Sequence, residues 1–255
     1  MGGCPSLYDD CVKATRDPAT TRLHLVRHGL VEDRWLGRLY GDLDVSLSEF
    51  GRDQAREAAR TLADVELAAV ASSDLARAIF GAEAIAASRG LEVAALPGLR
   101  EISRGDWAGQ RIVDLRDQHP GALEAWNADP EHVRPPAGES ISDLRARVLP
   151  ALEALASASP GADVAIVAHG WVIRSTVGWT LGLPAEHVRR LHVPPASITT
   201  IDWPVGSLER CGLEIDTETA HRDRPYLVGA NTDREAPAAR GWYRAPNDPD
   251  HRVPG

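Results

Sequence analysis

The run Asp163-Val-Ala-Ile-Val167 restricts the fold of this chain more than any other segment. Its side chains are apolar at successive positions, so a strand formed here must be covered on both faces. Such a strand is typical of a parallel sheet that carries helices on either side. The neighbouring sequence supplies them, because one helical pattern extends from Ser140 to about Ala156 and another from Trp171 to Leu181.

The same alternation runs through the rest of the chain. Short apolar runs predict strands at Arg22–Val26, Leu67–Ala71, Leu91–Ala95 and Ser197–Trp203. Helices are predicted at Ser48–Leu62, Asp74–Ser88 and Ile112–Trp126, the last broken at Pro120-Gly121. Ser46 or Ser48 is the expected N-cap of the first of these helices, and Ser72 or Asp74 that of the second. The pattern indicates an α/β protein with a largely parallel sheet covered on both sides.

A single folded domain is expected over residues 21–227. Residues 1–20 show no periodicity and are predicted to form a loose leader. Residues 228–255 are rich in Pro, Asp and Arg, and are predicted to be a mobile or draped tail in which Trp242 and Tyr243 could dock on the body.

Charge and cysteine content narrow the partners and the compartment. The formal net charge of −9 makes nucleic acid and anionic lipid poor partners. No segment approaches the roughly 18 apolar residues that cross a bilayer, and the N-terminus lacks the apolar run of a secretory signal. Cys4, Cys11 and Cys211 form no CxxC pair, which predicts reduced thiols and a cytoplasmic location.

Two histidines stand in the same local arrangement. His28 follows the strand that ends at Val26, between Arg27 and Gly29, and His169 follows the strand that ends at Val167 and precedes Gly170. Ligand sites of parallel sheets gather beyond the carboxyl ends of strands. A neutral imidazole is a nitrogen nucleophile, and a guanidinium fork suits phosphate oxygens. Each triplet alone also fits a simpler description, a surface turn for the first and a buried, satisfied histidine for the second.

Two further segments place charged groups at strand ends. Arg77 lies about one turn into the helix that follows Ser72-Ser73-Asp74, where it can point at the end of the sheet. Glu101 lies between apolar residues in Leu99-Arg-Glu-Ile102, and such a carboxyl group can hold a proton to donate. Taken alone, each residue is better explained as a solvated surface group.

Taken together and in order, the motifs resemble the histidine phosphatase superfamily, which includes the cofactor-dependent phosphoglycerate mutases. They are Leu25-Val-Arg-His-Gly29, Ser72-Ser-Asp-Leu-Ala-Arg-Ala78, Leu99-Arg-Glu-Ile102 and Val167-Ala-His-Gly-Trp-Val-Ile-Arg174, and Gly41–Gly51 is similar to the stretch before the family's first helix. The resemblance covers about Leu23 to Trp203. It implies a three-layer α/β/α sandwich with a mostly parallel sheet, like that of phosphoglycerate mutase.

The resemblance also implies roles for the residues. His28 would be the nucleophile that becomes phosphorylated. Arg27, Arg77 and His169 would bind the phosphate, and Glu101 would donate a proton to the leaving oxygen. Two guanidinium groups and an imidazolium can stabilise a transferring phosphoryl group, so no metal and no cofactor is expected.

The chain departs from the family at the mouth of the expected site. Leu30-Val31 follows the first triplet where relatives often have an acidic or hydroxyl residue, and Arg34 stands where an Asn is frequent. Arg34, Arg38 and Arg104 add positive charge there. Arg34 and Arg104 are therefore candidates for binding a second acidic group of the substrate, although solvated surface arginines would look the same.

The expected activity is hydrolysis of a small phosphomonoester, such as a sugar phosphate or a phosphoglycerate-type metabolite. A phosphoglycerate-type phosphomutase is the alternative, but the mutases carry a longer, basic insertion between the residues that match Glu101 and His169. A catalytically inactive binding relative is an alternative of another class, and a phosphoprotein substrate also stays open. The sequence does not decide the assembly, for which a homodimer is one possibility.

Overall fold

The computed structural model describes residues 17–211 and 225–230. The strands are β1 (Thr20–Arg27), β2 (Leu67–Ser72), β3 (Val93–Ala95), β4 (Asp163–Ala168), β5 (Ile198–Pro204) and β6 (Tyr226–Ala230). The helices are α2 (Glu49–Thr61), α3 (Ala76–Ala87), α4 (Ile112–Gln118), α5 (Ala122–Ala128), α6 (Ile141–Ala158), α7 (Gly170–Thr180), α8 (Ala185–Val188) and α9 (Ser207–Cys211), with short 3-10 turns η1 (Asp33–Trp35), η2 (Pro97–Leu99) and η3 (Gly105–Trp107).

The strands form one sheet in the order β3-β2-β4-β1-β5-β6. Strands β3, β2, β4 and β1 run parallel to one another, whereas β5 pairs antiparallel with β1 and β6 pairs antiparallel with β5. The predicted mostly parallel sheet is confirmed, with an antiparallel pair at one edge.

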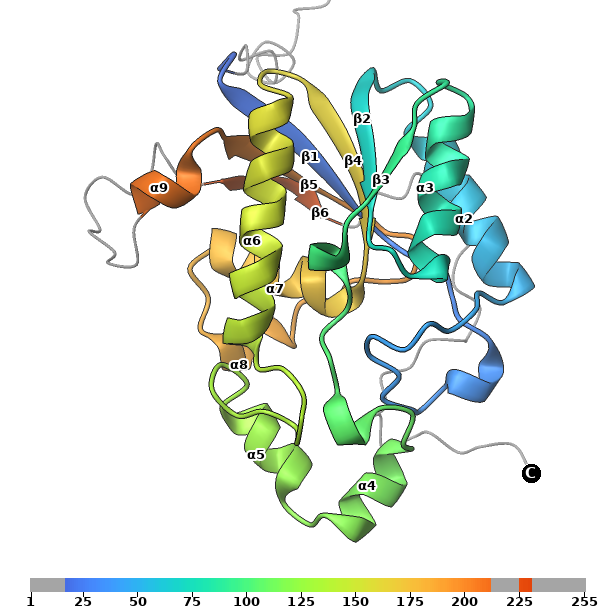
Figure 1. The fold of residues 1–255 in the computed structure, drawn as a ribbon, viewed down its shortest axis with the longest axis vertical. Coiled ribbons are helices and arrows are strands. Elements are labelled where there is room, and N and C mark those ends of the chain that lie inside the picture. Colours follow the sequence, from blue (N-terminus) through green and yellow to red (C-terminus); the bar gives the residue numbers. More distant parts are fainter. Residues whose placement is uncertain (1–16, 212–224, 231–255) are drawn as a thin grey trace, which may run out of the picture.

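Helices cover both faces of the sheet (Figure 1). Side chains of β4 alternate between two hydrophobic clusters: Val164 and Ile166 pack with residues of α6 and α7, whereas Ala165 and Val167 pack with residues of α2 and α3. This is why the β4 sequence is apolar on both faces, and it confirms the three-layer α/β/α sandwich.

The helix starts follow local chemistry in two of three cases. The hydroxyl of Ser48 caps α2 by accepting from the N–H of Gly51, and Ser140 and Asp143 form a reciprocal capping box at the start of α6. The predicted cap of α3 by Ser72 or Asp74 is wrong. The N–H of Ala76 donates instead to the carboxylate of Asp44, which comes from a distant loop.

The predicted break at Pro120-Gly121 is confirmed: the segment forms the separate helices α4 and α5, with Gly121 in a left-handed conformation between them. One predicted boundary shifts. Strand β6 extends to Ala230, past the domain boundary predicted at residue 227, so the start of the predicted tail belongs to the sheet. Trp242 and Tyr243 lie outside the described residues, as does most of the predicted leader. None of the described helices is long and apolar enough to cross a membrane.

Candidate active site

The two histidine triplets meet because their strands are neighbours. Strands β1 and β4 pair in parallel with Arg27 opposite Ala168, so the residues that follow, His28 and His169, leave the same edge of the sheet side by side. Their ring centroids lie 5.1 Å apart. The structure therefore brings together two residues that are far apart in sequence but occupy the same place in the repeated strand–His–Gly arrangement.

His28 is buried, and its hydrogen bond fixes its tautomer. Its Nδ1 lies 2.7 Å from the carbonyl oxygen of Gly29. A carbonyl oxygen can only accept, so Nδ1 carries the proton and Nε2 keeps a lone pair. Burial, followed by the positive charges of Arg77 and Arg27, holds the pKa of His28 well below its usual range. The side chain is thus a neutral nitrogen base at neutral pH.

Both predicted phosphate-binding arginines are anchored by backbone carbonyls. Nη1 of Arg27 donates to the carbonyl of Val193 over 2.6 Å. Arg77 is buried in the first turn of α3, and its Nη atoms donate to the carbonyls of Leu43 at 2.6 Å and Gly41 at 2.7 Å. These anchors fix each guanidinium while leaving its Nε uncommitted.

His169 is the residue before α7 and is also buried. Its Nε2 lies 2.6 Å from the hydroxyl of Ser73. Burial, followed by the positive charges of Arg77 and Arg27, holds the pKa of His169 well below its usual range. An imidazolium was expected here, whereas the side chain is neutral at neutral pH.

Three buried nitrogens in this cluster have no hydrogen-bond partner among the described residues. They are Nε of Arg27, Nε of Arg77 and Nδ1 of His169. Buried polar atoms are nearly always paired, and exceptions often mark a place where a ligand supplies the partner. All three belong to residues predicted to bind phosphate, and these residues lie close to His28: Arg27 precedes it, the His169 ring is 5.1 Å away, and the charges of Arg77 and Arg27 act on it.

Glu101 is buried beside this cluster. Its carboxylate accepts from the N–H of Ile102 at 2.9 Å and from the N–H of Trp171 at 3.1 and 3.2 Å, so it bridges its own loop to the first turn of α7. A Cβ on Gly170 would lie 3.6 Å from Nε of Arg27 and 3.7 Å from Oε2 of Glu101. Glu101 and Arg27 thus face the same small space.

The first turns of α6 hold the Glu101 loop in place. Arg147 donates to the carbonyl of Glu101 at 3.0 Å and to Oε2 of Glu139 at 2.8 Å. Glu139 in turn accepts from the N–H of Ser103 at 2.8 Å. These partly buried hydrogen bonds hold the backbone of Glu101 and of Ser103, which carries and follows the Glu101 carboxyl group.

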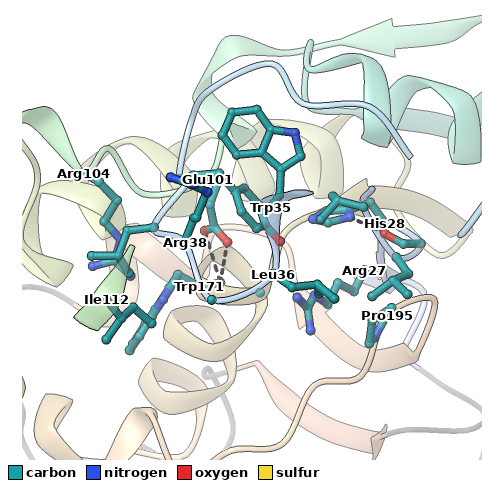
Figure 2. Close-up of a pocket in the computed structure, with 18 of the residues that line it drawn as sticks. Arg27, His28, Trp35, Leu36, Arg38, Glu101, Arg104, Ile112, Trp171 and Pro195 are labelled. Atoms are coloured by element: carbon teal, nitrogen blue, oxygen red, sulfur yellow. Dashed lines mark hydrogen bonds between the residues drawn. The ribbon is translucent and has the colours of Figure 1, made fainter. Parts of the chain in front are cut away.

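Arg27, His28 and Glu101 line a cavity of about 210 Å³, whereas Arg77 and His169 are buried behind its wall and are not among the lining residues. Figure 2 shows Arg27 and His28 at one end, Arg104 and Ile112 at the other, and Glu101 between them. Aromatic and aliphatic side chains supply much of the wall, including Trp35, Leu36 and Trp171. The arrangement places an unprotonated imidazole nitrogen, a carboxyl group and positive charge along the cavity.

The three other arginines named from the sequence differ in their position. Arg104 is buried and lines the cavity. Arg38 also lines the cavity. Arg34 does not line it among the described residues. Its Nη2 lies 2.7 Å from the Glu32 carboxylate on the surface, so the expected substrate contact of Arg34 is not supported.

Sequence reasoning missed three contributors. Ser73, Trp171 and Arg174 all lie within the quoted motifs, yet they received no role. The available signal was their place in the sequence: Ser73 lies shortly before Arg77, and Trp171 and Arg174 lie shortly after His169. Among the described residues, no group of three or more His, Cys, Asp or Glu side chains is placed to hold a metal ion.

The comparisons with known proteins agree with this geometry. Residues 23–210 match the family profile of the histidine phosphatase superfamily, branch 1. This match covers most of the chain, and the chain belongs to that superfamily.

Similar proteins include some named as phosphatases and some named as phosphoglycerate mutases. A glucosyl-3-phosphoglycerate phosphatase of Mycolicibacterium vanbaalenii is 37% identical over 65% of this chain and 76% of its own length. A protein of Cronobacter sakazakii named "Probable phosphoglycerate mutase GpmB" is 32% identical over 81% of this chain and 97% of its own. The solved structure of a mycobacterial glucosyl-3-phosphoglycerate phosphatase in complex with VO3 superposes with a TM-score of 0.64 at 35% identity, covering 71% of this chain and 92% of that one.

Proposed function

We propose that this protein is a phosphatase that hydrolyses small phosphomonoesters through a phosphohistidine formed at His28. The carrying observation is the set of three unpartnered buried nitrogens on Arg27, Arg77 and His169, three residues close to a histidine whose Nε2 holds a lone pair. A phosphoryl group presents three equatorial oxygens to such a set. The named phosphatase relatives support the same reaction class.

The first step forms one bond and breaks one. The Nε2 lone pair of His28 attacks phosphorus in line with the ester oxygen, and the bond between phosphorus and that oxygen breaks. The leaving oxygen keeps the electron pair and takes a proton from Glu101. Arg27 and Arg77 stabilise the charge on the equatorial oxygens, because the anchors of their other nitrogens hold them in position.

The second step restores the enzyme. Water attacks the phosphorus of phosphohistidine, Glu101 takes the proton of that water, and the bond between phosphorus and Nε2 breaks. Inorganic phosphate leaves, and Glu101 is protonated again for the next cycle. His169 is neutral in the free site because of burial and nearby positive charge, and a bound phosphate dianion would oppose that effect.

The segment between η3 and α6, which would cover the site, favours hydrolysis over mutase activity. Two short helices, α4 and α5, are the only helices among the described residues between η3 and α6, and the segment around them is acidic or neutral. A mutase must shield its phosphohistidine from water and hold a bisphosphate, which calls for a longer, basic cover. The mutase remains the second candidate because of the relative named GpmB. Incubation with a phosphoglycerate separates the two: a phosphatase releases inorganic phosphate, and a mutase yields the isomeric ester.

The proposal includes a cytoplasmic location. It rests on the three cysteines without a CxxC pair and on the acidic composition, and cell fractionation tests it.

The central test is covalent trapping. Brief incubation with a ³²P-labelled ester, followed by quenching in base, should leave acid-labile label on the protein. His28→Ala should lose both the label and turnover, because the attacking nitrogen is gone. Full activity in that variant would overturn the proposal. An inactive binding relative would release no phosphate from any ester tested.

A further inference from the structure

Two further arginine side chains, Arg104 and Arg174, line the cavity, and Figure 2 shows Arg104 at the end away from His28. Arg104 directly precedes η3, and Arg174 lies in the first turns of α7. The proposed phosphoryl transfer uses neither of them, since Arg27 and Arg77 already serve the phosphate. Arg174 donates from its Nε to the carbonyl of Leu191 at 2.8 Å, so Arg104 is the charge that needs its own explanation.

The Arg104 guanidinium packs on aromatic rings and is not paired with an acidic side chain of the described residues. Its guanidinium carbon lies 4.5 Å from the ring centroid of Trp126 and 5.4 Å from that of Trp171. It makes no hydrogen bond or ion pair through its side chain with any of the residues that the structure describes. The residue is nonetheless buried and lines the cavity. A buried guanidinium whose donors face a cavity is a site for an anion.

The local charge balance agrees with this description. Burial lowers the pKa of Arg104 to about 10, against a smaller opposing effect of the Glu101 carboxylate, and the positive charge of Arg174 lowers it further. Arg174 packs on the same indole, 5.4 Å from the ring centroid of Trp171. Arg104 still carries its charge at neutral pH, and an anion between the two guanidinium groups would relieve their repulsion.

We propose that Arg104, with Arg174 beside it, binds a second anionic group, a carboxylate or a phosphate, on the leaving group of the substrate. This inference rests on the proposed function, because it takes the phosphoryl group to lie at His28. The order of groups in the cavity carries it: His28 at one end, Glu101 in the middle and Arg104 at the other end (Figure 2).

The geometry also gives the direction of the leaving group. Its ester oxygen must lie near Glu101 to receive the proton, so its carbon atoms extend from there toward Arg104. The cavity walls include Ile112 and Trp171. A leaving group that carries an anion supplies Arg104 with a partner, whereas an uncharged one leaves Arg104 buried without a partner.

The test compares three ligands that share one carbon skeleton. They are glycerol phosphate, phosphoglycerate and glycerol bisphosphate, each esterified on a terminal hydroxyl. Binding is measured by calorimetry on the full chain carrying His28→Ala, so that no turnover interferes. Charge-assisted hydrogen bonds should make at least one of the two anionic ligands bind about 10- to 100-fold more tightly than glycerol phosphate. The comparison of phosphoglycerate with glycerol bisphosphate shows whether the site prefers a carboxylate or a phosphate.

Substitutions then assign this preference to Arg104. Arg104→Gln should bring the ratio of affinities close to one, and Arg104→Lys should keep part of it. Arg34→Gln is the matched control, because it removes the same charge from a surface residue paired with Glu32 and should leave the ratio unchanged. If Arg104→Gln does not fold, Arg174→Gln provides the second variant, and it should lower the ratio as well.

Two results would overturn the anion site. One is equal affinity for all three ligands before any substitution at Arg104. The other is a loss of equal size on all three ligands in the Arg104 and Arg174 variants, which would mean that these arginines only support Glu101 or the fold. Failure of the unsubstituted enzyme to release phosphate from any ester would refute the phosphatase proposal instead, while the binding ratio still decides the anion site.

Discussion

At the scale of single side chains, the hydrogen bond from His28 to the carbonyl of Gly29 decides which nitrogen can react. With the proton on Nδ1, the lone pair lies on Nε2, on the opposite side of the ring. Burial lowers the pKa of His28 together with Arg77 and Arg27, so in the proposed reaction the charges that would receive the phosphate also keep the nucleophile unprotonated. Nucleophile activation and phosphate binding thus depend on one set of residues.

Glu101→Gln tests the role of the carboxyl group. The change keeps the shape but removes the transferable proton, and general acid catalysis is typically worth about 10² to 10⁴ in rate. An alkoxide needs this proton to leave, whereas nitrophenolate leaves without it. We expect kcat/KM to fall much more for an alkyl phosphate than for nitrophenyl phosphate.

The control is His28→Ala, which should affect both substrates alike because the attacking atom is missing in each case. Comparing kcat/KM avoids interference from slow hydrolysis of the phosphohistidine. An equal loss on both esters in Glu101→Gln would show that Glu101 orients a pocket group, and Asp106 would be the next candidate for the proton donor.

Individual side chains were predictable where a strand end fixes their position. His28 and His169 directly follow β1 and β4, so their meeting follows from the sheet. Arg34 was assigned to the cavity from its sequence distance to His28, but η1 intervenes and turns its side chain to Glu32. Ser73 was missed because its partner, His169, lies 96 positions away, and no local pattern announces that contact.

At the scale of elements, the loop after β1 is fitted closely to the start of α2. A Cβ on Gly29 would lie 1.9 Å from the carbonyl oxygen of Gly51, and a Cβ on Gly51 would lie 1.9 Å from that of Leu30. The φ angle of Gly29 is not positive, so close packing and not a left-handed backbone is the reason for glycine there. This contact positions the backbone that carries His28.

Gly29→Ala should therefore damage activity and stability together. The new methyl group meets a backbone atom, so the loop or α2 must shift, and overpacking of this kind costs about 1 to 3 kcal/mol. A displacement of about 1 Å at a catalytic group can cost 10²-fold in rate. Thermal melting and kcat/KM on one ester measure the two effects.

Gly90→Ala provides the matched control for this change. Gly90 has a φ of 64° and open space around its Cβ position, and it lies after α3, away from the cavity. Strain at a left-handed residue costs about 1 to 2 kcal/mol, so stability should fall while kcat/KM stays the same. Wild-type kcat/KM in Gly29→Ala would show that the contact with Gly51 does not position His28.

Element identity was more predictable than the contacts at element ends. The cap of α2 by Ser48 and the capping box of α6 lie within four residues of sequence, so local chemistry announces them. The N–H of Ala76 at the start of α3 is satisfied by Asp44, 32 positions earlier, while the predicted caps Ser72 and Asp74 contact Val167 and Arg100 instead. A local cap rule cannot foresee a partner supplied by tertiary structure.

At the scale of the whole molecule, the class of sheet followed from apolar strands between helices, but its order did not. Strand β4 lies between β2 and β1, and β5 enters antiparallel beside β1. Nothing in the alternating pattern fixes the direction of the last strands, because β5 follows a short helix and a loop that permit either. The site nevertheless depends on this order, since it makes β1 and β4 neighbours and so unites His28 with His169.

The pair of buried neutral histidines should make the stability of the whole protein depend on pH. The unfolded chain takes up a proton on each histidine as the pH falls through about 6.5, whereas burial and the charges of Arg77 and Arg27 keep His28 and His169 unprotonated in the fold. The unfolded state then binds more protons, so stability falls as the pH is lowered. Well below pH 6.5 the expected slope is about 1.4 kcal/mol per pH unit for each histidine.

Urea unfolding at several values between about pH 5 and pH 7 measures this slope, in a range above the titration of most carboxylates. Replacing both His28 and His169 by Asn should flatten it, because neither side chain then gains a proton on unfolding. His119→Asn is the control: this histidine is exposed at the end of α4, and its removal should leave the slope unchanged. An unaltered slope in the double variant would mean that the two site histidines are protonated in the folded protein, which would also remove the neutral nucleophile on which the proposed reaction depends.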